Sequence, residues 1–294
     1  MDVGGKYDPE GGAFDHHQKG FDETLPGHGT KLSSAGLVYK HFGREVIAAL
    51  TAGVATWPAH VAEVVYEKVY ADFVEAIDGI DNGVDVALGQ PKAYRVSTDL
   101  SSRVGRLFPA WNEPQGSALV NECFRDALLL TGAEVLGKVT SLAKSWWPAR
   151  SVVEQAMDAR NAVDPSGHVM VLESGGLPWQ THVFDIEAER AAAAGGGGGD
   201  QGRLLFVLYE DSGGKWRVQA VPEAEGSFES RLKLGTAAWR GLRDDALSEA
   251  CGLPGAVFVH AAGFIGGHET RAGALGMALQ TIALNAASEA AAAK

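Results

Sequence analysis

The sequence predicts an α/β fold built from two domains. Segments whose apolar residues recur every three or four positions alternate with short β-branched segments in both halves of the chain, a pattern typical of α/β proteins. A chain of 294 residues is also long enough for two domains of ordinary size. We expect a first domain over residues 1–145, ending in a linking helix, and a second over residues 150–285.

The first domain is expected to open with a β-hairpin and a helix. Tyr7 and Phe14 flank a Pro-Glu-Gly-Gly turn, which is typical of two short antiparallel strands. Ser33 or Ser34 is the expected N-cap of the helix that follows, and Gly43 is its expected end.

A longer helical pattern covers residues 60–83 and stops at Gly79 and an Asn-Gly pair. Its apolar stripe consists of Val61, Val64, Val65, Val69, Phe73 and Ile77. After a polar and irregular region, residues 117–146 return to helical spacing, and we expect this helix to link the two domains.

The second domain is expected to contain a sheet. Residues 168–175 and 204–222 are rich in β-branched side chains, and a Ser-Gly-Gly turn divides the latter segment into two strands. Residues 255–284 indicate a strand, a glycine-rich turn and a helix. Residues 190–202 contain a run of alanine and glycine, which predicts a flexible surface insertion between two strands.

Composition narrows the functional classes. A formal net charge of −12 argues against a protein that holds long nucleic acid by a basic face, but not against an enzyme that engages a strand end. Cys123 and Cys251 are isolated, which argues against a zinc–cysteine site and a disulfide framework and favours an intracellular protein. No window carries the run of about 18 apolar residues that a membrane span needs. The N-terminus lacks the pattern of a secretory signal.

Candidate metal ligands lie near the start of the chain. Asp2 follows what we interpret as the end of a strand, where open α/β sheets bind ligands, although aspartate is also common in turns. The triplet Asp15-His16-His17 combines a carboxylate with imidazoles, which suits Mn, Fe or Zn. In extended backbone the two histidines point in opposite directions, so one can bind a metal while the other faces substrate. The flanking aspartate can orient an imidazole, and a polar loop with two histidines is the alternative.

Two further carboxylates, Asp78 and Asp81, lie at the end of the long helical pattern. They are about one helical turn apart, so either can reach the same site. The spacing does not decide between them, and polar chemistry at a helix C-terminus is the alternative interpretation.

A resemblance to a known family rests on several motifs in order. "MDVGGKYDPEGGAFDHHQKGF", "KLSSAGLVYKHFG" and "AIDGIDNG" resemble motifs two to four of the DHH phosphoesterase superfamily and, more narrowly, the MYG family, also described as metal-dependent protein hydrolases. "VSTDLSSRVGRLFPAWNE", "SWWPARSVVEQAM" and "AWRGLRDDALSEACGLPGAVFVHAAGFIGGHETRAGALGMA" extend the resemblance over nearly the whole chain. It implies a DHH-type first domain with a mainly parallel sheet and a smaller C-terminal α/β substrate domain.

The resemblance also implies an activity. It predicts a metal-dependent phosphodiesterase, a 3′–5′ exonuclease on RNA or short oligonucleotides, in which two divalent ions, Mn or Mg, activate water. A phosphatase or pyrophosphatase acting on a small substrate is one alternative, and a non-catalytic binding protein is another. The family implies the mitochondrion or the nucleus as the compartment, with the cytoplasm as a further option.

Carried over residue by residue, the resemblance makes Asp2, His16 and His17 the catalytic residues. Asp2 is expected to bridge the metals, His16 to bind the second metal, and His17 to support a ligand or face the phosphate. Asp81 or Asp78 supplies a further carboxylate. The substrate-binding residues implied for a glycine-rich turn and its surroundings are Gly266, Gly267, His268, Arg271 and Arg103, with Arg240 and Arg243 as weaker candidates.

The chain departs from the family pattern at its start. The first motif, an HNGxFHxDE-like stretch that contributes a histidine and aspartates, is expected upstream of Asp2, and Met1 stands where the family has an interior strand residue. We therefore expect a first domain without its first strand, in a truncated chain, a fragment or a degenerate paralogue. Because ligands would be lost with that motif, the expected catalysis is weak or absent.

Overall fold

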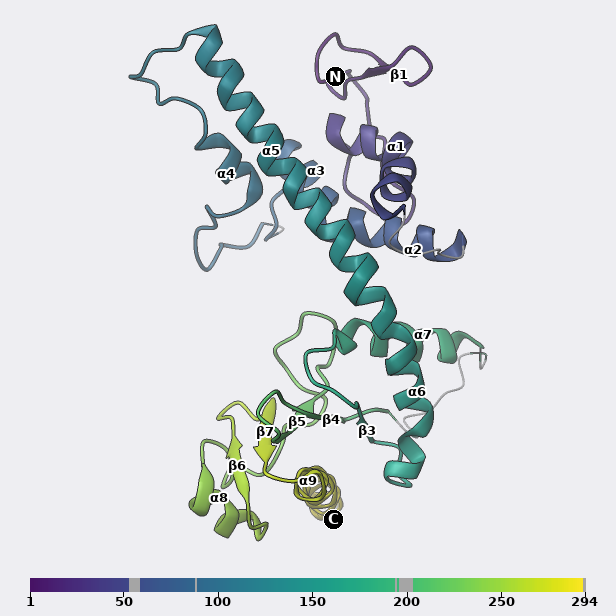
Figure 1. The fold of residues 1–294 in the computed structure, drawn as a ribbon, viewed down its shortest axis with the longest axis vertical. Coiled ribbons are helices and arrows are strands. Elements are labelled where there is room, and N and C mark those ends of the chain that lie inside the picture. The colour runs from purple at the N-terminus through teal and green to yellow at the C-terminus, as the bar shows by residue number, and fades with distance from the viewer. Residues whose placement is uncertain (53–58, 88, 194, 196–202, 293–294) are drawn as a thin grey trace. The chain divides into compact units, whose positions relative to one another are not determined.

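The computed structural model describes residues 1–52, 59–87, 89–193, 195 and 203–292. The chain divides into two compact units, Met1–Lys144 and Ser145–Lys294 (Figure 1). Helices and a mixed sheet make up the described residues, which confirms the α/β class. Among those residues, no helix combines the length and the apolar character needed to cross a bilayer.

The first unit is mostly helical and begins with a hairpin. Strands β1 (Tyr7–Asp8) and β2 (Ala13–Phe14) pair antiparallel, with Tyr7 opposite Phe14, which confirms the predicted hairpin. The other elements are α1 (Ser34–Thr51), α2 (Ala59–Val69), the π-helical turn η1 (Tyr70–Val74), α3 (Glu75–Asp81), α4 (Leu100–Gly105) and α5 (Ser117–Ser141).

The mainly parallel sheet expected in the first domain is not what its described residues form. They contain β1 and β2 alone, and these strands are antiparallel. The connection of four residues between them can join only antiparallel neighbours, because a parallel pair needs a crossover of roughly a dozen residues or more. Asp2, expected at a strand end, instead has a φ of 63° in an irregular segment.

Helix α1 begins as predicted but ends later. Ser33 is its N-cap, and the Ser33 hydroxyl accepts hydrogen bonds from two N–H groups of the first turn. The expected end at Gly43 is wrong, since the helix continues to Thr51. A Cβ on Gly43 would lie 2.9 Å from the rings of Tyr39 and Tyr66. Glycine therefore permits close packing of α1 on α2 instead of terminating the helix.

The π-helical turn η1 rotates the buried face of the long helical segment. The buried residues of this segment are Val61, Val65, Tyr66, Val69, Tyr70, Val74 and Asp78. The row Val61, Val65 and Val69 would continue at Phe73 and Ile77, but beyond the π turn the buried positions are Val74 and Asp78, because a π turn inserts one residue into the helix. The predicted core positions Phe73 and Ile77 are consequently only half-buried, and Asp78 turns inward in their place.

The second unit contains a five-stranded sheet in the order β3-β4-β5-β7-β6. Its strands are β3 (Val169–Val171), β4 (Phe206–Glu210), β5 (Trp216–Ala220), β6 (Ala256–Val259) and β7 (Ile265–His268). Only β3 and β4 pair in parallel, and the other neighbours are antiparallel. Its helices are α6 (Trp147–Val163), α7 (Trp179–Ala193), α8 (Asp244–Cys251) and α9 (Arg271–Ala292). Another π-helical turn, η2 (Leu142–Trp146), lies between α5 and α6 in the chain.

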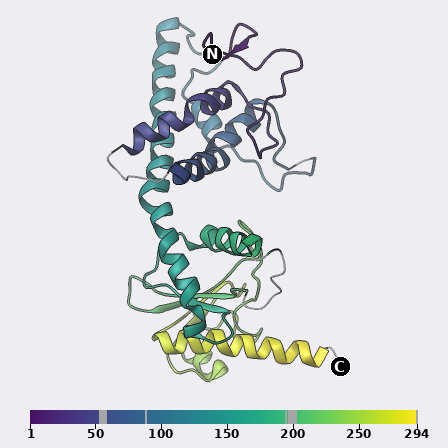
Figure 2. The ribbon, with the colours of Figure 1, turned by 90° about the vertical axis from the view of Figure 1, so that its right-hand side faces the viewer.

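The sheet of the second unit has a hydrophobic core on each face. On one face, Met277 of α9 packs with Phe206 and Val218. On the other, residues of α6 and α7, including Met157 and Val183, pack over β3 and β4. Figure 2 shows the yellow helix α9 and the green helix α7 on opposite sides of the sheet. The alternating side chains of the strands thus supply both cores.

Two sequence predictions for the second domain need correction. The expected glycine-rich turn in residues 255–284 is wrong, because β6 and β7 form a hairpin and Gly266 and Gly267 lie within β7. Within the expected insertion, residues 190–193 complete α7. Residues 194 and 196–202 lie outside the residues that the structure describes.

Candidate metal centre

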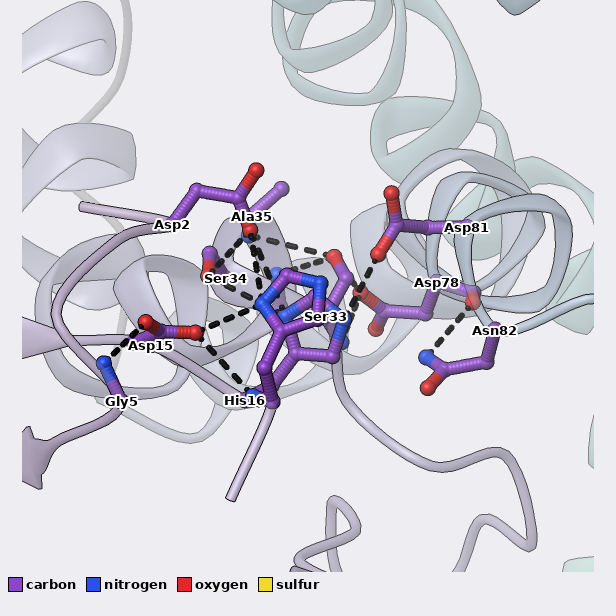
Figure 3. A network of polar contacts seen from close by, with 12 residues as sticks. Asp2, Gly5, Asp15, His16, Ser33, Ser34, Ala35, Asp78, Asp81 and Asn82 are labelled. Atoms are coloured by element: carbon purple, nitrogen blue, oxygen red, sulfur yellow. Dashed lines mark hydrogen bonds and ion pairs between the residues drawn. The ribbon is translucent and has the colours of Figure 1, made fainter.

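Four polar side chains near the start of the first unit gather in one place: Asp2, Asp15, His16 and His17. Each offers one ligand atom, and these atoms lie within 4.8 Å of one another. Figure 3 shows the surrounding network of polar contacts. Asp15 and His16 are buried, whereas Asp2 and His17 are exposed. Carboxylates and imidazoles together form a donor set for a divalent transition metal.

The hairpin places these residues. The N–H of Asp2 donates to the carbonyl of Phe14 over 2.9 Å, and the N–H of Asp15 donates to the carbonyl of Lys6 over 3.2 Å. The Phe14 ring is buried and lies 5.7 Å from the ring of Phe42 on α1. The segment before β1 therefore lies along the end of β2, and the triplet follows directly from an anchored strand.

Asp15 fixes the position of its neighbour His17. The carboxylate oxygen Oδ1 accepts from the Nδ1 of His17 over 2.7 Å and from its backbone N–H over 3.0 Å, while Oδ2 accepts from the N–H of Gly5 over 2.7 Å. The His17 hydrogen bond, followed by that of Gly5, lowers the pKa of Asp15 to about 2. The same carboxylate raises the pKa of His17. Since Nδ1 is the donor, Nε2 of neutral His17 carries the lone pair.

His16 lies between two groups of polar atoms. Its Nδ1 is 3.2 Å from the hydroxyl of Ser34 and 3.5 Å from Oδ1 of Asp2, and its Nε2 is 3.0 Å from Oδ2 of Asp81. The Ser34 hydroxyl donates its single proton to Asp2 over 3.0 Å. That hydroxyl can then only accept from His16, so Nδ1 of His16 carries the ring proton and Nε2 the lone pair.

This tautomer leaves two acceptors facing each other. Nε2 of His16 and Oδ2 of Asp81 are 3.0 Å apart, and both atoms carry lone pairs. A second proton on the imidazole or a cation bound by both atoms satisfies the contact. The contact between Nε2 of His16 and Oδ2 of Asp81 is therefore stabilised by a proton or a cation between the two atoms.

Asp78 and Asp81 have different environments. Asp78 is fully buried, and its Oδ1 accepts from the N–H of Ser33 over 3.0 Å and from its hydroxyl over 2.6 Å, while Oδ2 accepts from the hydroxyl of Tyr70 over 3.0 Å. Burial raises the pKa of Asp78. The Asp81 side chain is 45% exposed and contacts His16. The structure therefore places Asp81 at the cluster and Asp78 in a network beneath the start of α1 (Figure 3).

The substrate-binding candidates of the second unit occupy a strand and its end. Gly266 and Gly267 lie in β7 between β5 and β6, so their backbone N–H groups point within the sheet. His268 is buried, and its Nδ1 accepts from the N–H of Thr270 over 3.0 Å. Gly266 and Gly267 therefore lie in a strand and not in the expected turn, and their part in substrate binding stays a prediction.

The arginine candidates all have partners within their own units. Arg103 belongs to the first unit, and the others belong to the second. The partners are the Glu134 carboxylate for Arg103, the Gly235 carbonyl for Arg240, the Phe258 ring for Arg243 and the Trp216 ring for Arg271.

Sequence reasoning did not assign Ser34 to the cluster. The sequence pattern predicts only a capping function for Ser34, and in the structure that function belongs to Ser33. Two adjacent serines at the start of a helix indicate such a contact. When the first serine caps the helix, the second lies in the first turn and its hydroxyl is free to contact other groups.

The fold and the site define a class: an α/β protein whose first unit gathers carboxylates and imidazoles suited to a divalent cation. The chain belongs to the family described as Uncharacterised protein family (UPF0160), whose model matches residues 1–282. No solved structure matches the chain.

The relatives carry names that bear on activity. The chain is 45% identical over 290 residues to the MYG1 exonuclease of Mus musculus, covering 96% of this chain and 73% of that protein. It is 44% identical over 290 residues to the MYG1 exonuclease of Homo sapiens, with the same coverage of both proteins. It is 37% identical over 291 residues to the MYG1 protein YER156C of Saccharomyces cerevisiae, covering 96% of this chain and 82% of that protein. The names of the mammalian relatives indicate nuclease, and hence hydrolase, function at the level of the family.

Proposed function

We propose that the protein is a metal-dependent phosphodiesterase that removes nucleotides from the 3′ end of RNA or short oligonucleotides. The observation that carries the proposal is the contact between Nε2 of His16 and Oδ2 of Asp81, with Asp2 on the other side of the imidazole. The nucleic-acid substrate is proposed because the family includes proteins named exonuclease.

The residues of the cluster fit a divalent ion. Two ligand atoms that are each about 2.1 Å from one ion, at a right angle, are about 3.0 Å apart. Nε2 of His16 and Oδ2 of Asp81 have this separation. We assign His16 and Asp81 to hold this ion, and Asp2, on the Nδ1 side of the imidazole, to complete the metal site. The imidazole favours manganese over magnesium, whose sites are mostly oxygen.

Each side chain of the cluster has a distinct task in the proposed reaction. Bound divalent ions, singly or as a pair, lower the pKa of water and neutralise charge on the phosphoryl group. Asp15 holds the ring of His17 through Nδ1. The exposed His17, whose pKa Asp15 raises, is the residue we assign to donate a hydrogen bond to the phosphate through Nε2 when the imidazole is protonated. Ser34 holds both Asp2 and His16. The Asp15-His16-His17 triplet supports placing the protein, as part of this proposal, in the DHH phosphoesterase superfamily.

The proposal is tested with a 5′-labelled single-stranded RNA oligonucleotide and the chain in excess, with manganese or with EDTA. We expect a ladder that shortens from the 3′ end in manganese and no cleavage in EDTA. The His16→Ala chain, prepared in parallel, controls for contaminating nucleases. An RNA that stays intact in manganese, or is cut equally by the His16→Ala chain, would contradict the proposal.

Inorganic pyrophosphate, tested in the same assay, distinguishes the exonuclease from a small-substrate phosphatase and from a non-catalytic binding protein. Hydrolysis of pyrophosphate with intact RNA would replace the exonuclease by a small-substrate phosphatase. Neither activity, together with no bound metal in an elemental assay, would favour a non-catalytic binding protein.

Replacing Ser34 by alanine is expected to weaken manganese binding about 10- to 100-fold, the usual cost of losing a group that orients a ligand. The Ser34 hydroxyl contacts Asp2 and His16 and is not itself assigned as a ligand. The measurement is titration calorimetry. Ser33→Ala is the matched control, because losing the N-cap and the hydrogen bond to Asp78 should lower stability and leave the affinity unchanged. Equal affinities for wild type and Ser34→Ala would show that Ser34 does not position the ligands.

A further inference from the structure

Four residues of the second unit lie in one line across the sheet. Arg217 on β5 is opposite Gly267 on β7, Gly267 is opposite Phe258 on β6, and Phe258 pairs with Arg243 in the segment before α8. We call these residues the cross-strand row. The adjacent Val218 is buried in the core beneath α9. Successive side chains of a strand point to opposite faces, so the row lies on the face away from α9.

The row forms an aromatic and cationic surface. The guanidinium of Arg217 is 5.1 Å from the centre of the Phe258 ring, and that of Arg243 is 5.6 Å from it. Both distances are within the range of cation–π contacts. The ring and the two guanidinium groups therefore lie at adjacent positions.

Gly267 makes this arrangement possible. A Cβ at Gly267 would lie 2.5 Å from Nη1 of Arg217 and 3.0 Å from the ring of Phe258. Without that atom, the arginine side chain can lie across β7 onto the ring. Asp211 pairs with Nη2 of Arg217 over 2.5 Å, while Nη1 is buried without a hydrogen-bond partner. The close approach of Arg217 to Phe258 thus depends on glycine at this strand position.

The row is accessible from solvent. Arg243 is exposed, and Arg217 and Phe258 are half-buried. Helices α6 and α7 pack over β3 and β4, at the other end of this face. Among the residues that the structure describes, Arg243 forms no ion pair, so its positive charge is free to meet an anion.

We propose that the cross-strand row binds single-stranded nucleic acid, with bases stacked on the guanidinium and phenyl planes and a phosphate beside Arg243. Each base has a π face, so stacking accepts any sequence, and arginine adds charge complementary to the backbone. This inference rests on the proposed function and names the contacts through which that substrate is held. Such a surface suits an enzyme that must accept each successive nucleotide, in a chain whose net charge of −12 offers little general attraction for RNA.

The test is the binding of a fluorescein-labelled RNA dodecamer, measured by anisotropy in EDTA so that no cleavage occurs. Phe258→Leu keeps the apolar bulk and removes the stacking plane, and we expect binding about tenfold weaker. Arg243→Gln is expected to weaken binding and to lower the slope of log K against log salt by about 0.7, the value for one phosphate contact on a single strand. Arg190→Gln on α7 removes the same charge elsewhere on the unit and should bind as wild type does.

The outcomes separate this inference from the proposed function. No binding by wild type, or equal affinities for Phe258→Leu, Arg243→Gln and Arg190→Gln, would overturn the row as a binding surface. Preference for an acidic peptide or for duplex RNA of the same sequence would overturn it as well. Binding is measured without metal, so it does not depend on cleavage. If RNA binding depended on the row but the chain cleaved no RNA in manganese, the proposed function would be contradicted and the row would stand as a binding surface. Arg243 is exposed, so its variant remains informative if Phe258→Leu unfolds.

Discussion

Replacing His16 with alanine is expected to abolish manganese binding and, with it, any metal-dependent nuclease activity. His16 is the buried member of the cluster that contacts both sides of the site: its Nδ1 faces Ser34 and Asp2, and its Nε2 faces Asp81. The loss of a group that only orients a ligand usually costs 10- to 100-fold in affinity, so the loss of a ligand should exceed roughly 100-fold.

The measurement is titration calorimetry with manganese, and a nuclease assay follows on the same preparations. His260→Ala is the matched control, because His260 is an exposed histidine of the second unit. Its affinity for manganese should equal that of wild type. If His16→Ala retained wild-type affinity, the triplet would be a polar loop and the assignment of His16 as a ligand would be wrong.

Replacing Asp78 with alanine is expected to destabilise the first unit without directly removing a metal ligand. The carboxylate accepts hydrogen bonds from the N–H and hydroxyl of Ser33 and from the hydroxyl of Tyr70. Each buried donor left without a partner costs about 1–3 kcal/mol, so we expect the free energy of unfolding to fall by about 3 kcal/mol or more. Denaturant unfolding followed by circular dichroism measures the change.

Asp81→Ala is the contrasting variant. The Asp81 side chain is 45% exposed, and surface substitutions usually change stability by less than about 0.5 kcal/mol. We expect this variant to unfold as wild type does and to lose manganese affinity. The reverse result, a stable Asp78→Ala chain with no metal affinity and an unaffected Asp81→Ala chain, would exchange the roles of the two aspartates.

The hairpin, the start of α1 and three strands of the second unit were predictable from the sequence, because interactions between residues close in the chain determine them. The Pro-Glu-Gly-Gly turn specified the hairpin, because four residues between short strands allow only antiparallel pairing. Ser33 was recognisable as one of two possible caps, and the strands β3, β4 and β5 followed from their β-branched composition. The gathering of Asp2 with the triplet was expected from the family resemblance, and the structure explains it by the hairpin, which returns the chain to its starting point.

Features that depend on packing between distant segments were not predictable in this way. Helical spacing alone could not choose between Asp78 and Asp81, because the π turn η1 shifts the inward face by one residue and buries Asp78. From the sequence alone, Gly43 is expected to end a helix and Gly267 to lie in a turn. Each instead makes room for a side chain from another segment, Tyr66 in one case and Arg217 in the other.

The assignment of His16, Asp81 and Asp2 as metal ligands is the central claim, and anomalous X-ray diffraction at the manganese edge from crystals grown with manganese tests it most directly. We predict an anomalous peak within about 2.0–2.3 Å of both Nε2 of His16 and Oδ2 of Asp81. No peak at these atoms, or a peak bound by other residues, would contradict the claim.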